Sequence, residues 1–304
     1  MMKRRTIKMW LIILLCFVIV GLALFLVSVA KYDWSFKKFA QRNFMTNEYV
    51  IDDNFNKIII FATTANIDFK PSTDGKCKVV CYENKKETHK TYVENGELKI
   101  KKVNKKKWYD YLDIISALPK ITMYLPDLSG ASLSLEVSTG NVKIPKEFSF
   151  ESIDISGTTS DIKCFASSTK QTKIHVTTGD IIVENASAES YDLAVTTGDI
   201  KLKNVNCQNL VSTGSTGDIK MQELIAVNKI SITTSTGEVE FYRCDAGEIV
   251  ITTSTGDIEG SLLSSKQFIV QTNTGDIDIP STVSGGRCEI KTKTGDIEIT
   301  IANN

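Results

Sequence analysis

Residues 177–200 read TTGDIIVENASAESYDLAVTTGDI, so the phrase TTGDI occurs twice at an interval of 19 residues. Variants of this phrase recur between residues 131 and 304, nine copies in all, at steps of 19 or 20 residues. A constant period of this length is typical of a solenoid, in which each repeat forms one coil of a stack. The sequence therefore predicts an all-β, single-stack β-solenoid of about nine coils, similar to a β-helix.

One apolar column runs through all nine copies of the phrase. The residue two places after the repeated glycine, or after Ser160 in the one copy that lacks it, is always isoleucine or valine. Side chains two residues apart in a strand point to the same face, so we expect strands on both sides of the turn with a shared interior. Each buried isoleucine then contributes about 1.5–3 kcal/mol to stability. The predicted core ladder consists of Val142, Ile162, Ile181, Ile200, Ile219, Val239, Ile258, Ile277 and Ile297.

The glycine and the acidic residue after it are expected to shape the turn. Glycine permits positive φ, and a carboxylate accepts hydrogen bonds from nearby backbone amides. Stacked carboxylates are also potential calcium ligands, but the phrase lacks the GGxGxDxUx pattern of calcium-binding β-rolls. We therefore predict a structural ladder and no metal or cofactor. It comprises Gly140, Gly179, Asp180, Gly198, Asp199, Gly217, Asp218, Gly237, Glu238, Gly256, Asp257, Gly275, Asp276, Gly295 and Asp296.

Residues 9–30 form an uncharged apolar run, long enough for a helix to cross the bilayer. Four basic residues precede it, which favours a cytoplasmic N-terminus. Ser28 and Ala30 also fit a signal-peptidase site, but the run is longer than the apolar core of a cleaved signal. We expect a single-pass protein of the cell membrane that contacts the bilayer through residues 9–30 and exposes its repeats outside the cytoplasm.

The domain boundaries follow from these changes of pattern. We predict a cytoplasmic tail at 1–8, a transmembrane helix at 9–30, a juxtamembrane segment at 31–48, a β-rich part that caps the solenoid at 49–130, and the repeats at 131–304.

The β-rich part holds two further clues. The phrase TTANIDF resembles a repeat with Ala65 in the glycine position, so a degenerate first coil is expected there. Cys77 and Cys81 share one face of a strand, but no second pair or suitably spaced histidine accompanies them, so the spacing does not predict zinc. Lysines crowd residues 76–107, and we interpret them as a solvated hairpin in preference to a patch for anionic lipid or wall polymer.

The sequence contains no recognised catalytic motif. GxSxG, HExxH and P-loop patterns are absent, and neither His89 nor His175 lies in a catalytic phrase. We therefore expect a protein that is not an enzyme and has no nucleic-acid partner.

The anchor, the phrase ELKI at 97–100, the strand ITMYLP at 121–126 and the TGDI coils together resemble the bacterial "putative adhesin" family of β-strand-repeat proteins. The similarity covers roughly residues 49–304. It implies a membrane-attached β-solenoid of the cell envelope, and some members resemble components of envelope-stress operons. It implies no catalytic residues.

Three roles follow as hypotheses. The leading one is a binding or structural module at the cell envelope, with an envelope polymer or a protein as its partner. The second is an accessory protein of a cell-envelope stress response. The third is a scaffold that self-associates through the end of the stack near residues 297–301.

Overall fold

The computed structural model describes residues 4–41, 43–108, 117–127, 130–282 and 284–302. The chain is mostly β, at 63%, and forms a β-solenoid of about eight turns with one apolar helix at its N-terminus, as the repeats and the apolar run predict. It divides into two compact units, which are described separately. The smaller unit comprises Met1–Met45, Asn84–Lys86 and Lys105–Ala117, and the larger one comprises Thr46–Glu83, Glu87–Asn104 and Leu118–Asn304.

The smaller unit contains the two helices, α1 (Arg4–Ala30) and α2 (Phe36–Ala40). Within α1, Lys8–Ala30 has a mean hydropathy of 3.2, and its length and composition suit either a membrane span or a signal sequence. The short helix α2 is capped by Ser35, whose hydroxyl accepts a hydrogen bond from a backbone N–H of its first turn.

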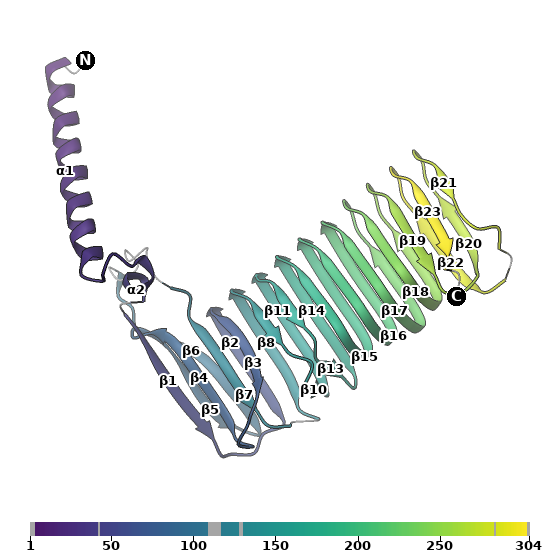
Figure 1. Cartoon of the computed structure of the whole chain (residues 1–304), viewed down its shortest axis with the longest axis horizontal. Coiled ribbons are helices and arrows are strands. Elements are labelled where there is room, and N and C mark those ends of the chain that lie inside the picture. Colours follow the sequence, from purple (N-terminus) through teal and green to yellow (C-terminus); the bar gives the residue numbers. More distant parts are fainter. Residues whose placement is uncertain (1–3, 42, 109–116, 128–129, 283, 303–304) are drawn as a thin grey trace. The chain divides into compact units, whose positions relative to one another are not determined.

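The larger unit is the solenoid, in which parallel strands of successive coils build two sheets (Figure 1). The first sheet holds the residues before each glycine turn, and the second sheet holds those after it. In spatial order the first sheet contains β6 (Glu97–Asn104), β2 (Lys57–Thr64), β8 (Ser132–Thr139), β11 (Ser152–Thr159), β14 (Gln171–Thr178), parts of β15–β18, β22 (Gly286–Lys291) and β20 (Lys266–Gln271).

The strands of the second sheet also pair in parallel with one another, and four long strands join the two sheets. It contains β7 (Lys120–Leu125), β3 (Asn66–Pro71), β9 (Val142–Ile144), β12 (Ile162–Cys164), parts of β15–β18, β19 (Ile258–Leu262), β23 (Ile297–Ile301) and β21 (Ile277–Asp278). The joining strands are β15 (Ile181–Thr197), β16 (Ile200–Thr216), β17 (Ile219–Thr233) and β18 (Val239–Thr252), and a short pair consists of β10 (Ser149–Phe150) and β13 (Ser167–Ser168).

At both ends of the stack the spatial order of the coils departs from their order in the sequence. The coil of β22 and β23 lies between that of β18 and β19 and that of β20 and β21, although it comes last in the chain (Figure 1). At the other end the coil of β2 and β3 lies between that of β6 and β7 and that of β8 and β9. The prediction that the stack ends near residues 297–301 therefore holds only in part: β21 lies beyond Ile297 and Glu298, whereas among the described residues no strand pairs with the outer side of residues 299–301.

Three further strands complete the end that is nearer the N-terminus. They are β5 (Glu87–Glu94), which pairs antiparallel with β6, β4 (Cys77–Asn84), which pairs antiparallel with β7, and β1 (Phe44–Ile51), which pairs with β4. We call this the covered end of the solenoid. At the opposite end, no strand among the described residues pairs with the outer side of β20 or β21, and we call this the bare end.

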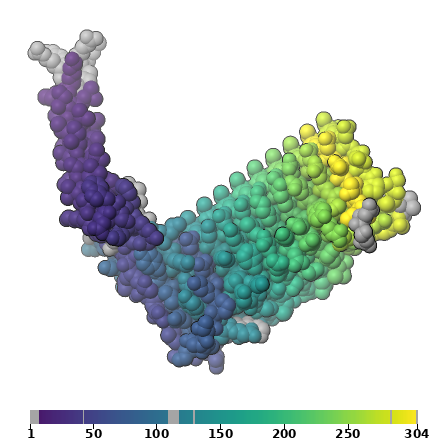
Figure 2. Space-filling model, viewed as in Figure 1, coloured from purple at the N-terminus to yellow at the C-terminus, as the bar shows by residue number. Residues whose placement is uncertain are grey.

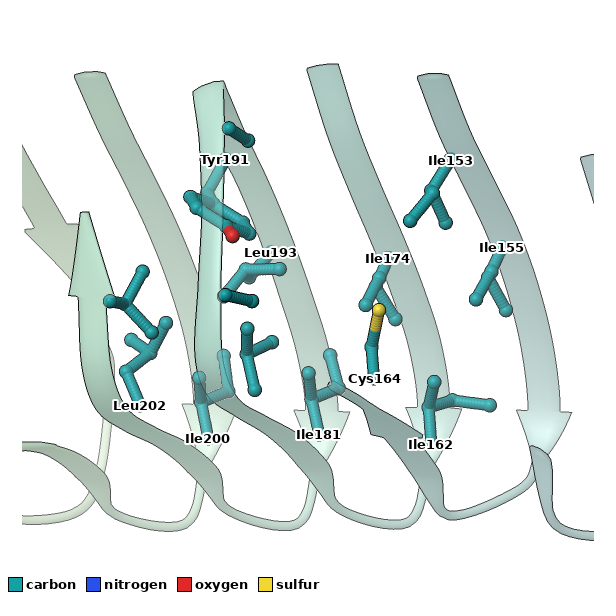
Figure 3. Packing of buried hydrophobic residues seen from close by; sticks show 14 of the residues in the cluster. Ile153, Ile155, Ile162, Cys164, Ile174, Ile181, Tyr191, Leu193, Ile200 and Leu202 are labelled. Carbon is teal, nitrogen blue, oxygen red and sulfur yellow. The ribbon is translucent and has the colours of Figure 1, made fainter. Parts of the chain in front are cut away.

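Aliphatic columns fill the space between the sheets. Figure 3 shows residues such as Ile155, Ile174 and Leu193 pointing inward from successive strands, with Ile162, Ile181 and Ile200 facing them. Eight residues of the predicted core ladder are at most 1% exposed. Ile277 departs from the prediction because it is 46% exposed. Its strand β21 has a neighbouring coil on one side only, which leaves half of the side chain without a packing partner.

The glycine turn depends on the absence of a side chain. Gly198 has a φ of 136°, and a Cβ there would lie 2.2 Å from the carbonyl oxygen of Gly179 in the adjacent coil. Ala65 occupies this column in the coil of β2 and β3, which confirms the degenerate coil predicted from TTANIDF. Figure 2 shows a regular row of protruding atoms along one edge of the solenoid, as expected for coils that repeat along a stack.

A second corner lies six residues after the glycine, and the sequence analysis did not predict it. Asn185, Asn204, Glu223 and Arg243 take positive φ values of 50–53° there. The Asn204 amide nitrogen donates a hydrogen bond to the Asn185 side-chain oxygen at 2.8 Å, so the corners of adjacent coils are joined. This corner turns the chain from the second sheet toward the first sheet of the next coil.

Candidate functional site

The acidic residues of the predicted turn ladder bind the next coil through its backbone. The Asp199 N–H donates to an Asp180 carboxylate oxygen at 2.9 Å, and the Asp218 N–H donates to Asp199 at 3.1 Å. The chain of contacts follows the spatial order at the bare end, where Asp296 N–H donates to Asp257 and Asp276 N–H donates to Asp296. These carboxylates therefore lie along one edge as backbone acceptors and do not converge on a shared site.

The lysine-rich segment forms the antiparallel hairpin of β5 and β6. Within it, Lys99 makes ion pairs with Glu94 at 2.9 Å and with Glu97 at 3.0 Å, and Lys102 pairs with Glu87. Much of the positive charge on this hairpin is therefore neutralised by its own carboxylates. The other histidine, His175, lies outside that hairpin. It is half-buried on the first sheet, with its Nε2 atom 3.1 Å from an Asp192 carboxylate oxygen.

A groove of about 610 Å³ on the outer face of the second sheet is the candidate binding site. Its central row contains one outward side chain from each of five coils, and backbone pairing holds the five in register. The row reads, in spatial order, Lys201, Lys220, Glu240, Glu259 and Glu298.

The basic side of the groove is compensated by neighbouring carboxylates. Lys201 forms an ion pair with Asp199 at 3.0 Å, and Lys220 contacts both Glu240 and, at 3.8 Å, Asp218. The hydrogen bond that Lys201 donates to Asp199 raises the pKa of Lys201, and the one that Lys220 donates to Glu240 raises the pKa of Lys220. Both lysines therefore already have anionic partners within the protein.

The acidic side is different because Glu259 and Glu298 stand side by side on paired strands. Partial burial raises the pKa of Glu259, and repulsion from Glu298 and other nearby carboxylates adds to the shift. Among the described residues, neither glutamate has a lysine or arginine within ion-pair distance. Two adjacent, uncompensated carboxylates at coil spacing form a surface that attracts a cation.

Tyr242 and Gly260 complete the acidic side of the groove. Tyr242 is 57% exposed and presents an aromatic ring beside the row of glutamates. Gly260 leaves room in the core for the ring of Phe241, since a Cβ at this position would lie 2.4 Å from a ring carbon. An exposed ring next to carboxylates is suited to an organic cation, which gains from both the charge and the ring face.

The groove was not among the sequence-predicted sites, which all belong to the turn and core ladders. Its residues lie at the third position after the glycine, where the repeats differ from one another. The change from lysine to glutamate along this column is visible in the sequence. That change is the signal that identifies the groove once the coils are stacked in their spatial order.

Comparison with known proteins identifies the architecture. A family model described as Toastrack DUF4097 matches residues 55–241 and 204–304. Among curated proteins, none matches this chain.

Similar solved structures include "putative adhesins" from three bacteria. That of Parabacteroides merdae is 12% identical with a TM-score of 0.51, and it aligns over 85% of this chain and 96% of its own. That of Parabacteroides distasonis is 12% identical with a TM-score of 0.50, over 84% and 97%. That of Bacteroides fragilis is 17% identical with a TM-score of 0.48, over 84% and 97%. At such identities the likeness is one of fold. Because the family model spans the solenoid from residue 55 to residue 304, the chain belongs to the Toastrack DUF4097 family.

Proposed function

We propose that this protein is a membrane-anchored, extracytoplasmic binding module of the cell envelope that acts without catalysis. Two observations support this proposal. Helix α1 contains an apolar run, residues 9–30, that is long enough to span a bilayer, and the basic residues before this run favour a cytoplasmic N-terminus. Solved structures of similar fold are named as adhesins, which suggests a binding role for this chain as well.

The groove on the second sheet is the proposed ligand surface, and its ligand is an extended polymer that carries ammonium groups. The observation that carries this assignment is the uncompensated pair Glu259 and Glu298, with the exposed ring of Tyr242 beside it. Carboxylates on adjacent coils are spaced by about 4.8 Å, so they can contact successive cationic groups of one chain. Such contacts are exposed and therefore sensitive to salt.

The test compares a groove variant with a control of equal charge. The full chain in detergent or nanodiscs is mixed with isolated cell-wall polymer before and after N-acetylation, which removes the ammonium charge. A Glu259→Gln, Glu298→Gln variant is expected to bind roughly 3- to 10-fold more weakly than the wild type, since each exposed ion pair contributes about 0.2–1 kcal/mol. A Glu136→Gln, Asp154→Asn variant, with both changes on the exposed face of the first sheet, should bind normally. Equal binding to acetylated polymer would contradict the proposal.

Self-association is the second candidate, and the bare end is the observation that favours it. Strand β20 has no described partner on its outer side, and Ile269 in that strand is 49% exposed. An unpaired strand edge with exposed apolar residues can pair with a second copy. Light scattering at high protein concentration tests this role: dimers that an Ile269→Lys substitution abolishes would support it, and a monomer at every concentration would exclude it.

The stress-response role stays a prediction. Crosslinking in the membrane distinguishes it from the leading proposal, because recovery of a membrane-bound regulator would favour sensing, whereas recovery of an envelope polymer would favour binding.

A further inference from the structure

A buried cluster of three different metal-ligand types lies at the covered end of the solenoid. Cys81 and Glu83 come from β4, and His89 comes from β5. Cys81 and Glu83 are 0% exposed, and His89 is 3% exposed. Strand β4 extends the second sheet and β5 extends the first, so the cluster joins the two sheets at the last layer of the core.

The three side chains are close enough to share one ion. The Cys81 sulfur, a Glu83 carboxylate oxygen and a His89 ring nitrogen lie within 4.8 Å of one another. Residues two apart in a strand point to the same face, which explains why Cys81 and Glu83 both face the interior. Cys77 lies four residues before Cys81 on the same face, about 13 Å away at the rise of a strand, and does not belong to the cluster.

The carboxylate of Glu83 is held in place by several donors. Its Oε1 atom accepts a hydrogen bond from the Asn47 side chain at 2.6 Å, and its Oε2 atom accepts one from the His89 backbone N–H at 2.7 Å. The same Oε2 atom lies 2.6 Å from Nδ1 of the His89 ring. Tyr49 donates a hydrogen bond to the His89 carbonyl at 2.8 Å, which fixes the backbone of β5 at this point.

The other ring nitrogen of His89 is unexplained by this network. Nε2 is buried and has no hydrogen-bond partner among the described residues. A buried polar atom without a partner is destabilising by about 1–3 kcal/mol, and such atoms are rare in folded proteins. An ion pair between Glu83 and His89 accounts for Nδ1 but leaves both Nε2 and the adjacent thiol without a role.

We propose that Cys81, Glu83 and His89 form a binding site for one Zn²⁺ ion. A thiolate, an imidazole and a carboxylate are the ligand types that zinc accepts together, whereas calcium and magnesium take oxygen ligands only. Three protein ligands leave one position of a tetrahedral site for water. The bound ion ties the outermost strand of the first sheet to the outer strands of the second, and so fastens the cap of the solenoid.

Binding of the ion displaces a proton from the Cys81 thiol. Burial raises the pKa of the Cys81 thiol to about 12, and the nearby Glu83 adds to the shift, so the metal-free thiol holds its proton. The ion replaces that proton with a bond to sulfur, and the proton leaves to solvent. No electron transfer is involved, because zinc does not change its oxidation state.

Cobalt absorption tests the site on the full chain in detergent. Co²⁺ replaces Zn²⁺ in such sites, and a thiolate ligand produces an intense charge-transfer band in the near ultraviolet. The wild type is expected to bind one equivalent with this band, and added Zn²⁺ should abolish it. Cys81→Ser should lose the band, and His89→Gln should weaken metal binding at least about 10-fold. The matched control is Cys77→Ser, which alters a second buried cysteine of the same strand and should keep the band.

A measurement on unmutated protein covers the case in which Cys81→Ser does not fold. X-ray absorption at the zinc edge of the loaded wild type should find one sulfur at about 2.3 Å, with nitrogen or oxygen at about 2.0–2.2 Å for the remaining ligands. A wild type without the charge-transfer band, a band that survives Cys81→Ser, a band lost in folded Cys77→Ser, or a zinc shell without sulfur would each overturn the proposal.

Discussion

The same column of core residues reaches both ends of the solenoid, but its side chains are buried to different extents at the two ends. Ile121 belongs to the outermost repeat-like coil at the covered end, and Ile277 belongs to the outermost coil at the bare end. Ile121 is 0% exposed because β4 lies beyond it, whereas Ile277 is 46% exposed because no described strand lies beyond β21. Burial of a core residue in the stack therefore depends on having a neighbouring coil or strand on both sides. The repeat sequence alone does not specify those neighbours.

The bare end has features that limit unwanted strand pairing. Strand β21 is only two residues long, and Pro280 follows it closely. Lys266, the first residue of β20, turns inward and donates hydrogen bonds to the Ala246 carbonyl and the Ser264 hydroxyl, both at 2.8 Å. Short edge strands, prolines and inward-pointing charges are the usual ways in which an open sheet edge is protected.

The largest expected effect is a difference in stability loss when the same substitution, isoleucine to alanine, is made at each end. Ile121→Ala should lower the free energy of unfolding by about 2–5 kcal/mol, because it opens a cavity in a fully buried position. Ile277→Ala should lower it by less than about 1 kcal/mol, since half of its side chain already contacts solvent. Urea denaturation of both variants measures the difference. Equal losses would mean that the bare end is covered in solution.

An intermediate effect concerns the ladder of turn aspartates. Asp199→Ala removes the acceptor of the Asp218 N–H and should destabilise the protein by about 1–3 kcal/mol. Asp276 lies in the outermost coil, and among the described residues its carboxylate accepts no hydrogen bond. Asp276→Ala should therefore change the free energy of unfolding by no more than about 0.5 kcal/mol. Asp199→Asn, which retains an acceptor oxygen, is the control. Thermal unfolding of the three variants decides whether the ladder acts through hydrogen bonds or through charge.

The smallest expected effect concerns the pH dependence of stability, which should have opposite signs at two glutamates. Hydrogen bonds from Lys99 and Lys57 lower the pKa of Glu97 near the covered end, so this carboxylate adds stability at neutral pH that is lost as the pH falls through its folded pKa. Burial and neighbouring acids raise the pKa of Glu259, so that its ionisation opposes folding as the pH rises above its unfolded value.

Glutamine substitutions at the two sites should therefore act in opposite directions. At pH 7, Glu97→Gln should lower the melting temperature and Glu259→Gln should raise it, and each difference should fade as the pH falls through the folded and unfolded pKa values of that glutamate. Melting temperatures across that range provide the comparison. Shifts of the same sign would show that net charge, and not local environment, controls both sites.

The repeat chemistry made much of the fold predictable. The isoleucine column, the glycine that accepts no Cβ, and the degenerate copy around Ala65 could all be assigned from spacing and side-chain type. The spatial order of the outer coils could not be predicted. Every copy presents nearly the same strand edges, so pairing of β18 with β22 or with β20 satisfies the same pattern, and only the packing of particular side chains selects between them.

The candidate sites were harder to predict for a different reason. The second corner carries asparagine, glutamate and arginine in turn, so no shared residue type marks it. The groove depends on which outward residues become neighbours after stacking. The proposed metal site spans two strands in different sheets, and the CxxxC spacing of Cys77 and Cys81 does not indicate it. Strand parity alone would have associated Cys81 with Glu83, but nothing in the sequence brings His89 to them.

The insertion of β22 and β23 beneath β20 and β21 has a consequence for the order of folding. A stack that simply added coils in sequence could grow as the chain was synthesised, with each coil packing on the one before it. Here β20 and β21 cannot take their final positions until later residues have arrived to lie between them and β18 and β19. A chain interrupted before residue 286 would therefore lose an inner layer of the stack and leave the preceding coil without its native neighbour. Native pairing at this end therefore requires the later segment that contains β22 and β23.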